Sequence, residues 1–194
     1  IPAGACVALI GPSGSGKTTL LNLIGALDRP TSGTVTVLGQ EVSRFTERAA
    51  SDFRRERCGF VFQDDALVPE LTVLENVELP LVLVGRPARE RREWVRELLT
   101  RLLLVHRISA YPGTLSAGEK QRVAMARAII HGPQILLADE PTSHLDSHSA
   151  EAVMDALRNL ARKRGITVVV ATHDPRVFSR FDTQIKLRDG QLDF

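Results

Sequence analysis

The sequence predicts an α/β fold, with a mostly parallel β-sheet flanked by helices. Short runs rich in Val, Ile and Leu recur along the chain, and several are apolar throughout, as expected for strands that helices cover on both faces. With 194 residues, 43% of them hydrophobic, the chain is long enough for one domain with its own core. The expected strands cover residues 5–10, 34–38, 59–62, 135–138, 167–171 and 183–187, with a short last strand at 191–194.

A glycine-rich turn follows the first expected strand. Residues 11–18, Gly-Pro-Ser-Gly-Ser-Gly-Lys-Thr, fit the phosphate-loop pattern G-x-x-x-x-G-K-[ST] without a gap, and a helical run from Thr19 to Ala26 follows. Strand, turn and helix together aim backbone N–H groups at one anion, so we expect a nucleoside triphosphate here rather than a turn that merely caps a helix. The expected nucleotide-binding residues are Gly11, Pro12, Ser13, Gly14, Ser15, Gly16, Lys17, Thr18 and Thr19.

The residue types in this turn have chemical reasons. Gly11, Gly14 and Gly16 are expected to adopt positive φ and to let the backbone approach a phosphate closely, because a Cβ would collide there. Lys17 is expected to neutralise charge on the β- and γ-phosphates, and the Thr18 hydroxyl to bind Mg²⁺.

The middle of the chain is expected to be a helical insertion, because no strand candidate occurs from about residue 73 to 130. Glu97 and Arg101 form an i,i+4 pair on the wet side of one helix, and Pro80 is expected to kink or interrupt another. We therefore expect one domain, 1–194, with a sheet-containing core at about 1–63 and 132–194 and a helical subdomain at about 64–131. The apolar stripe of the insertion consists of Trp94, Val95, Leu98, Leu99 and Leu102.

Two carboxylates end another expected strand. Residues 135–138 are apolar, and Asp139 and Glu140 follow at the edge where open α/β sheets place their ligands. Asp139 is expected to hold Mg²⁺ through water, and Glu140 to polarise the water that attacks the γ-phosphate. The alternative is a pair of acids that simply opens a turn before Pro141.

Further motifs occur in a fixed order. Residues 115–122, Leu-Ser-Ala-Gly-Glu-Lys-Gln-Arg, precede an expected helix; Gln63 and His173 each follow a strand; and Ser-His-Leu-Asp occupies 143–146. The series resembles that of ATP-binding cassette (ABC) ATPases, whose signature reads L-S-G-G-Q or close to it, over nearly all 194 residues. The resemblance implies a P-loop NTPase fold with a RecA-like core, ATP and Mg²⁺ as cofactors, and a head-to-tail homodimer or pseudo-symmetric dimer. In that dimer each ATP lies between the phosphate loop of one subunit and the signature of the other.

The resemblance also implies roles for single residues. The signature residues Ser116, Gly118 and Glu119 are expected to contact ATP, although Ala117 stands where the family has its first glycine and Glu119 where it has glutamine. Taken alone, Gln63 and His173 would more often be surface or structural residues. As members of the series, the expected catalytic residues are Lys17, Gln63, Glu140 and His173, and the expected metal-binding residues are Thr18, Gln63 and Asp139.

Physical chemistry gives the signature a second, compatible interpretation. Ser116 and Glu119 have the S-x-x-E spacing of a capping box, which predicts a helix start with free N–H groups for a phosphate. Among the histidines, His144 is assigned to the dimer interface. The remaining three, His106, His131 and His148, are expected on the solvated surface.

The segment from Asp64 to Arg86 is similar to the lipoprotein-releasing and macrolide- or peptide-exporting branch of the family. This similarity implies an ATP-driven motor that docks on integral membrane permease subunits at the cytoplasmic face of the membrane. The permease is expected to be separate, because no run in this chain reaches the roughly 18 apolar residues that span a bilayer. The alternative is a cell-division-type or other non-transport ABC ATPase that signals to a partner. The docking groove is expected to involve Leu67, Val68, Leu71 and Leu74, each of which is as compatible with subdomain core.

Composition limits the other classes. Twenty-five Lys and Arg against 23 Asp and Glu are too balanced for a nucleic-acid surface, so no nucleic acid is expected as a partner. Cys6 and Cys58 lie in or beside apolar strands and are expected to be reduced thiols. The family stacks adenine on an upstream aromatic residue, and since none precedes Gly11 we expect the first strands to be missing from this chain.

Overall fold

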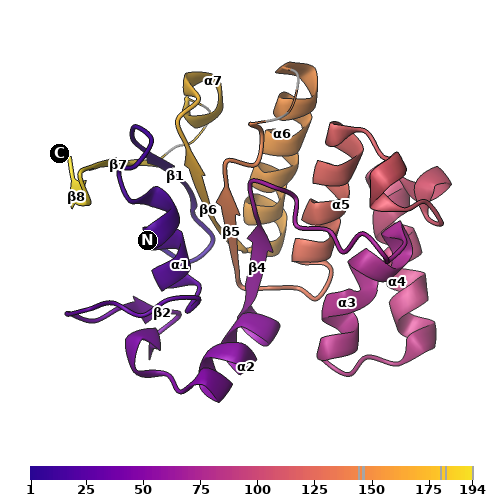
Figure 1. Cartoon of the computed structure of the whole chain (residues 1–194), viewed down its shortest axis with the longest axis horizontal. Coiled ribbons are helices and arrows are strands. Elements are labelled where there is room, and N and C mark those ends of the chain that lie inside the picture. The colour runs from indigo at the N-terminus through magenta and orange to yellow at the C-terminus, as the bar shows by residue number, and fades with distance from the viewer. Residues whose placement is uncertain (144, 146, 180, 182, 194) are drawn as a thin grey trace.

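The computed structural model describes the chain except for residues 144, 146, 180, 182 and 194 (Figure 1). The expectations for His144 and Asp146, and for the end of the last strand at Phe194, lie outside the described residues. The same is true of the side chain of His148.

A six-stranded sheet forms the centre of the fold, in the order β4-β5-β6-β1-β7-β8. Every neighbouring pair is parallel except β7 and β8, so the predicted mostly parallel sheet is confirmed. Because β1 lies between β6 and β7, the turn that leaves its carboxyl end stands in the middle of one sheet edge. The strands are β1 Cys6–Ile10, β4 Cys58–Val61, β5 Ile135–Asp139, β6 Thr167–Thr172, β7 Thr183–Arg188 and β8 Gln191–Leu192.

The expected strand at 34–38 does not join this sheet. Instead, β2 (Thr36–Val37) pairs antiparallel with β3 (Gln40–Glu41) in a separate ribbon, so the predicted strand is only two residues long and lies outside the main sheet. Leu38 and Gly39 between them have φ of 51° and 76°, and two such residues in succession form the tight turn that reverses a chain into a hairpin. A leucine in that turn hides the signal that an Asn-Gly pair would give.

Side chains of the strands alternate between two apolar layers, one on each face of the sheet. In β5, Leu136 and Ala138 pack with residues of α5 and α6, whereas Ile135 and Leu137 pack with residues of α1 and α2. The helices are α1 Lys17–Ile24, α2 Glu47–Arg57, α3 Val73–Leu83, α4 Ala88–Arg101, α5 Ala117–Ile129, α6 Ser147–Arg164 and α7 Pro175–Phe178, with short 3₁₀ turns at Val42–Arg44, Val105–Arg107 and Pro112–Thr114.

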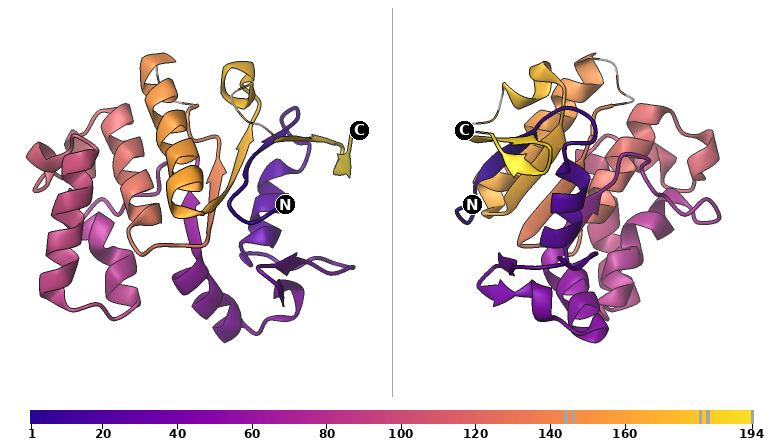
Figure 2. Two further views of the ribbon diagram at one scale, coloured as in Figure 1. Left: turned by 180° about the vertical axis from the view of Figure 1, so that it is seen from behind. Right: turned by 60° about the vertical axis from the view of Figure 1, so that its left-hand side comes forward.

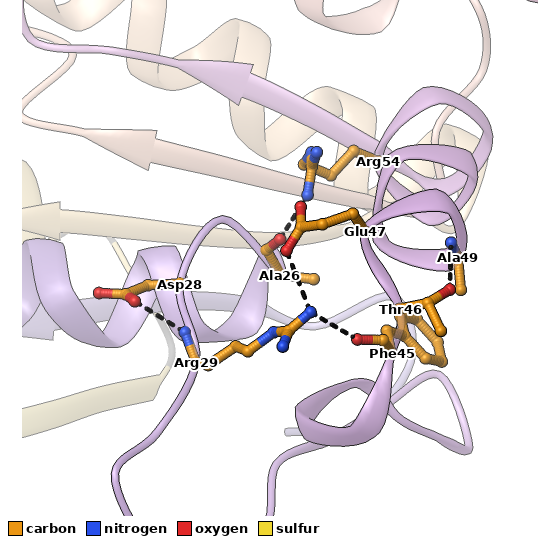
Figure 3. A network of polar contacts seen from close by, with 8 residues as sticks. All are labelled: Ala26, Asp28, Arg29, Phe45, Thr46, Glu47, Ala49 and Arg54. Carbon is orange, nitrogen blue, oxygen red and sulfur yellow. Dashed lines mark hydrogen bonds and ion pairs between the residues drawn. The ribbon is translucent and has the colours of Figure 1, made fainter.

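Polar contacts fix the start of α2 against the segment after α1 (Figure 3). The Thr46 hydroxyl caps α2 by accepting from the Ala49 N–H at 3.2 Å. Arg29 donates to the Phe45 carbonyl at 3.1 Å and to the Glu47 carboxylate at 3.0 Å. These bonds join the two ends of the segment that holds the β2–β3 ribbon.

Helices α3, α4 and α5 have a third apolar core of their own and stand beside the edge strand β4 (Figures 1 and 2). Pro80 does not interrupt α3, which runs unbroken because Val77 and Leu81 on either side of it are fully buried. In α4, Val95 and Leu99 are buried as expected, whereas Trp94 is 37% exposed. The expected pair of Glu97 and Arg101 is confirmed at 2.5 Å. The helix core contains Val73, Val77, Leu81, Val95, Leu99, Val123, Ala124 and Ala126.

Helix α5 packs very closely on β4. A Cβ on Gly59 would lie 2.1 Å from the Ala128 carbonyl oxygen, so this crossing requires glycine. Just beyond α5, His131 is half-buried and donates from Nε2 to the Cys58 carbonyl at 3.0 Å, so its expected place on the solvated surface is wrong. Burial lowers the pKa of His131 and raises that of Cys58 to about 12. Cys6 and Cys58 are thiols and are not joined in a disulfide.

Candidate functional site

The carboxyl ends of four parallel strands meet at one edge of the sheet. The register pairs Ile10 with Thr172, Asp139 with Ala171, and Val61 with Ala138. The phosphate loop after β1, Gln63 after β4, the carboxylates at the end of β5 and His173 after β6 therefore all lie at this edge. Open α/β sheets bind their ligands at such an edge, and the order of the strands brings together residues that are far apart in the sequence.

The phosphate loop is folded around a buried lysine. Lys17 is 7% exposed, and its Nζ donates to the carbonyls of Gly11 at 2.8 Å and Pro12 at 3.0 Å. Gly14 and Gly16 have φ of 80° and 97°, as expected. Gly11 differs, because its φ of 159° is close to extended; its need for glycine comes from β7, where a Cβ would lie 2.2 Å from the Leu187 carbonyl oxygen.

Within the described part of the chain, the start of α1 has unpaired hydrogen-bond donors and no negative charge, which suits an anion. Its N-cap residue, Gly16, offers no side-chain acceptor, and its first turn has no acidic residue. The buried Ser15 hydroxyl has no hydrogen-bond partner among the described residues. Orphan donors of this kind, at the positive end of a helix dipole, fit a phosphate group.

A hydroxyl and a carboxylate meet beside the loop. Thr18 Oγ1 donates to Asp139 Oδ2 at 2.7 Å. The described residues contain no cluster of three or more His, Cys, Asp and Glu side chains for a metal. The pair nonetheless fits Mg²⁺, since this ion prefers oxygen ligands and is bound by one or two protein groups together with water and nucleotide phosphates.

The second carboxylate is held by a histidine. His173 Nδ1 lies 2.6 Å from Glu140 Oε1, with the Glu140 side chain 12% and the His173 side chain 61% exposed. Glu140 has φ of 45°, a conformation that costs a residue with a Cβ about 1–3 kcal/mol. Its N–H donates to the Ala171 carbonyl at 2.9 Å, which fixes the strained residue to β6.

Gln63 is exposed and makes no hydrogen bond to a described residue, but the chain after it is firmly held. The guanidinium of Arg127 donates to the carbonyls of Asp65 and Ala66, and the fully buried Asn76 bonds the chain from Val68 onward. Sequence reasoning missed Arg127 and Asn76, because a single Arg or Asn in a helix gives no motif.

The signature residues form the predicted capping box. Ser116 Oγ accepts from the Glu119 N–H at 3.2 Å, and Glu119 Oε2 accepts from the Ser116 N–H at 2.8 Å. Arg107 Nε adds a bond to Glu119 Oε1 at 2.9 Å. The Ser116 amide, with help from Arg107, lowers the pKa of Glu119. Its carboxylate therefore turns back onto the start of α5 rather than outward.

The structure does not bring the signature to the phosphate loop. In both Figures 1 and 2, helix α1 and helix α5 stand on opposite sides of the strands β5 and β6. The start of α5, with Ser116 and Gly118, therefore belongs to a different part of the molecule from Lys17 and Asp139. Within one chain, the expected nucleotide-binding residues form two separate groups.

A groove of about 400 Å³ lies where β4 meets helices α3 and α5. The residues expected in the docking groove, Leu67, Val68, Leu71 and Leu74, are not among those that line it; Leu67 is 8% exposed and Leu74 packs on the helix core. Leu67 and Leu74 therefore belong to the apolar core of α3, α4 and α5, which is the alternative that the sequence left open. The larger apolar residues that line the groove are Leu27, Phe60, Phe62, Pro80 and Leu83.

Known proteins are similar to this chain in sequence and in fold. The family model for ABC transporters matches residues 1–143. The chain is 49% identical over 192 residues to the macrolide export ATP-binding/permease protein MacB of Shigella flexneri, and 48% identical to that of Escherichia coli strain K12. Each match covers 99% of this chain but 30% of the relative, so the chain spans less than a third of the length of these curated relatives.

Solved structures agree. MJ0796, described as a bacterial ABC transporter cassette with a dimeric structure, has a TM-score of 0.94 and 43% identity, covering 100% of this chain and 85% of that one. Another structure of MJ0796 is a dimeric post-hydrolysis state bound to ADP and Pi, with a TM-score of 0.94 and 42% identity. No helix among the described residues is long and apolar enough to cross a membrane. Sequence, fold and the arrangement of the motifs together place the chain in the ABC transporter family, as an ATP-binding cassette of the ATPase type.

Proposed function

We propose that this cassette hydrolyses ATP to drive a membrane transporter of the exporter or lipoprotein-releasing branch. The observation that carries the proposal is the sheet edge itself. There the Thr18–Asp139 pair, at 2.7 Å, and the Glu140–His173 pair, at 2.6 Å, follow neighbouring strands and flank the phosphate loop. Such an edge supplies both halves of phosphoryl-transfer chemistry: anion binding and a positioned base.

The residues divide the chemistry between them. Lys17 and the N–H groups at the start of α1 bind phosphate oxygens, while Thr18 and Asp139 hold Mg²⁺. Bound Mg²⁺ neutralises charge on the phosphates. Glu140 accepts a proton from the attacking water, and His173 orients Glu140 by donating from Nδ1 to its carboxylate. Gln63, the remaining catalytic candidate, positions the water at the end of β4.

The other half of the pocket comes from a second copy. Ser116 and Gly118 lie too far from the phosphate loop of their own chain, and the capped start of α5 is a second anion site. We propose a head-to-tail dimer in which this end of α5 completes the pocket of the partner subunit. A dimer has been described for the similar cassette MJ0796.

We also propose that the sheet-containing part, about 1–63 and 132–194, and the helical part, about 64–131, act as two subdomains. The apolar core that α3, α4 and α5 share supports this division, and α5 also joins the helical part to the sheet through Met125, Ala128 and Ile129. The groove between them takes a short helix of the permease, because Leu27, Phe62 and Leu83 expose apolar surface at 44%, 39% and 62% there. The similar MacB proteins are named ATP-binding/permease proteins, a name that joins a cassette and a permease in one protein. The cassette then works on the cytoplasmic face of the membrane.

The experiment is Glu140→Gln in the full-length protein that contains this chain. The variant should bind ATP with an affinity within about threefold of normal, lose turnover at least about a hundredfold, and accumulate an ATP-bound dimer in light scattering. Lys17→Ala is the matched variant, and it should lose ATP binding by calorimetry and form no such dimer. Normal turnover in Glu140→Gln, or a monomer with ATP and Mg²⁺, would contradict the proposal.

A further inference from the structure

We infer that Arg127 is a positioning residue for the nucleotide site: it holds the backbone that follows Gln63 and thereby sets where this glutamine stands at the sheet edge. The inference rests on the proposed role of Gln63. It goes beyond that role by assigning a function to a residue on α5, which no motif contains.

The contact is a fork on two successive carbonyls. Arg127 lies in the last turn of α5, and its Nη1 donates to the Ala66 carbonyl at 2.6 Å while Nη2 donates to the Asp65 carbonyl at 2.8 Å. A planar guanidinium that makes two bonds fixes the orientation of both acceptors, which a point charge such as a lysine ammonium does not. The side chain is buried enough to lower the pKa of Arg127, with the Asp65 carboxylate acting in the opposite sense.

The held backbone is one that requires support. Asp65 and Ala66 have φ of 29° and 50°, so two residues with a Cβ stand in succession in the left-handed region. Residues other than glycine adopt this conformation when their surroundings enforce it. The Asp65 carboxylate supplies part of the support by accepting from the Leu67 N–H at 3.2 Å. Arg127 supplies the support that comes from outside the loop.

Two side chains from different helices hold different parts of the loop after Gln63. Asn76 of α3 bonds the N–H and carbonyl of Val68 at 2.8 and 3.0 Å, and the carbonyls of Leu71 and Thr72. It therefore holds the later part of the loop. The part next to Gln63 is held from α5. Since Gln63 makes no hydrogen bond to a described residue, its position follows from these neighbours.

Helix α5 connects the signature with the strand that leads to Gln63. Next to Arg127, the Ala128 carbonyl packs against Gly59 of β4, so this end of the helix is fixed to the strand that leads to Gln63. The opposite end of α5 carries Ser116 and the rest of the capping box. Helix α5 thus carries the signature at its start and holds the loop after Gln63 at its end. The two proposed parts of the ATP site, the signature and Gln63, are therefore connected through one helix.

The test uses Arg127→Lys in the full-length protein, with Arg54→Lys as the matched control. Arg54 makes the same kind of bond, from Nη1 to the carbonyl of left-handed Ala26 at 2.5 Å, but at the segment after α1 (Figure 3). Ala66→Pro breaks the contact from the loop side, because proline cannot adopt φ of 50°, and leaves α5 unchanged if Arg127→Lys impairs folding. Each variant is made alone and combined with Gln63→Ala.

Arg127→Lys and Ala66→Pro should each lower kcat by about tenfold to a hundredfold, while ATP affinity without Mg²⁺ stays within about threefold. Amide hydrogen exchange of residues 64–68 should accelerate by at least about tenfold in both variants and not in Arg54→Lys. In the Gln63→Ala background either change should cost less than about twofold more in kcat, whereas any loss from Arg54→Lys should add in full.

The two ideas fail in different ways. A Gln63→Ala variant with normal kcat rejects the proposed role of Gln63, and the inference with it. A defective Gln63→Ala variant with full additivity of Arg127→Lys, or unchanged exchange at residues 64–68, rejects the inference alone and leaves the proposed function in place.

Discussion

Two helices of this chain begin with the same motif, and their surroundings give the two starts different uses. Helix α3 begins with Thr72–Glu75 and helix α5 with Ser116–Glu119, and in both the capping box is complete. In both, too, the hydrogen bonds of the box lower the pKa of its glutamate. The local chemistry is therefore the same, and it stabilises each helix by a similar amount.

The difference lies in the next N–H groups. In α3, the N–H groups of Val73 and Leu74 donate at 2.9 and 3.0 Å to carbonyls in the segment 108–110, so the start is closed. In α5, no described residue accepts from the N–H of Ala117 or Gly118. Only donors without a partner remain available to a phosphate. Availability of donors, rather than the motif, separates a structural helix start from one that can bind ATP.

The sharpest way to break this comparison is to make α5 resemble α3. Gly118→Leu places at the second helical position the residue type that α3 has there, Leu74. Turnover should fall at least about a hundredfold, because the leucine side chain would block the N–H donors that the proposed dimer turns toward the transferred phosphate. The melting temperature should stay or rise, since removing a helical glycine stabilises by roughly 0.5–1 kcal/mol.

Steady-state ATPase assays and thermal melts on the full-length protein measure both effects. Thr72→Ser, a mild change in the closed box of α3, is the control. Turnover within about threefold of normal in Gly118→Leu would show that the open start is not part of the pocket.

Removing the cap hydroxyls comes next in size. Ser116→Ala and Thr72→Ala should each cost about 0.5–2 kcal/mol of unfolding free energy, measured by urea denaturation. Ser116→Ala should lower kcat by a further tenfold or so, because in the proposed dimer its hydroxyl also contacts the nucleotide. Thr72→Ala should change kcat by less than about threefold. Equal losses of kcat in the two variants would remove the distinction between the two starts.

The far end of α5 predicts a moderate pH effect. Burial puts the pKa of folded His131 below the ordinary value of 6.5, so between these two values the unfolded chain binds more protons than the folded one. Stability should be complete above pH 6.5 and decline as the pH falls below it. His131→Gln should flatten the slope of the thermal midpoint against pH over this window. An unchanged slope in the variant would contradict the assignment.

The smallest expected effect concerns the guanidinium that α5 has and α3 lacks. Arg107→Ala should raise the pKa of Glu119 and leave that of Glu75 unaltered, as followed by carboxyl NMR titration. The Glu119 contribution to stability is complete above the ordinary glutamate pKa and is lost as the pH falls through the lowered value. In Arg107→Ala the loss should still begin at the ordinary glutamate pKa, but it should be smaller and end at a higher pH. Equal shifts at both glutamates would refute the local origin of the effect.

Much of the site could be predicted because its chemistry needs contiguous residues. The phosphate loop, the Asp139–Glu140 pair and the Ser116 cap each occupy a few consecutive positions, so their spacing survives in the sequence. The parallel sheet was predictable for a related reason, since strands covered on both faces are apolar throughout. The helix stripe of 94–102 was correct in its buried residues but not at Trp94, which the Arg86 guanidinium covers 5.3 Å from the ring centroid.

Other features depended on neighbours that spacing does not encode. His131 was expected in water, yet the close approach of α5 to Gly59 half-buries it. The ribbon of β2 and β3 forms through a turn with Leu38 in a left-handed conformation, which propensity disfavours. Pro80 lies within a continuous helix because burial of its flanking residues outweighs the lost backbone bond.

By itself, the sequence determined the chemical groups of this protein: an anion-binding loop, two adjacent carboxylates, a histidine and a capped helix, with α/β strands to carry them. The tertiary structure decided which of them meet. Parallel pairing of β1, β4, β5 and β6 gathers the ends of strands from distant parts of the chain at one edge, and the same packing keeps the start of α5 away from them. Sequence patterns record local periodicity, whereas contacts between distant segments arise from how whole layers pack and which donors that packing leaves unpaired.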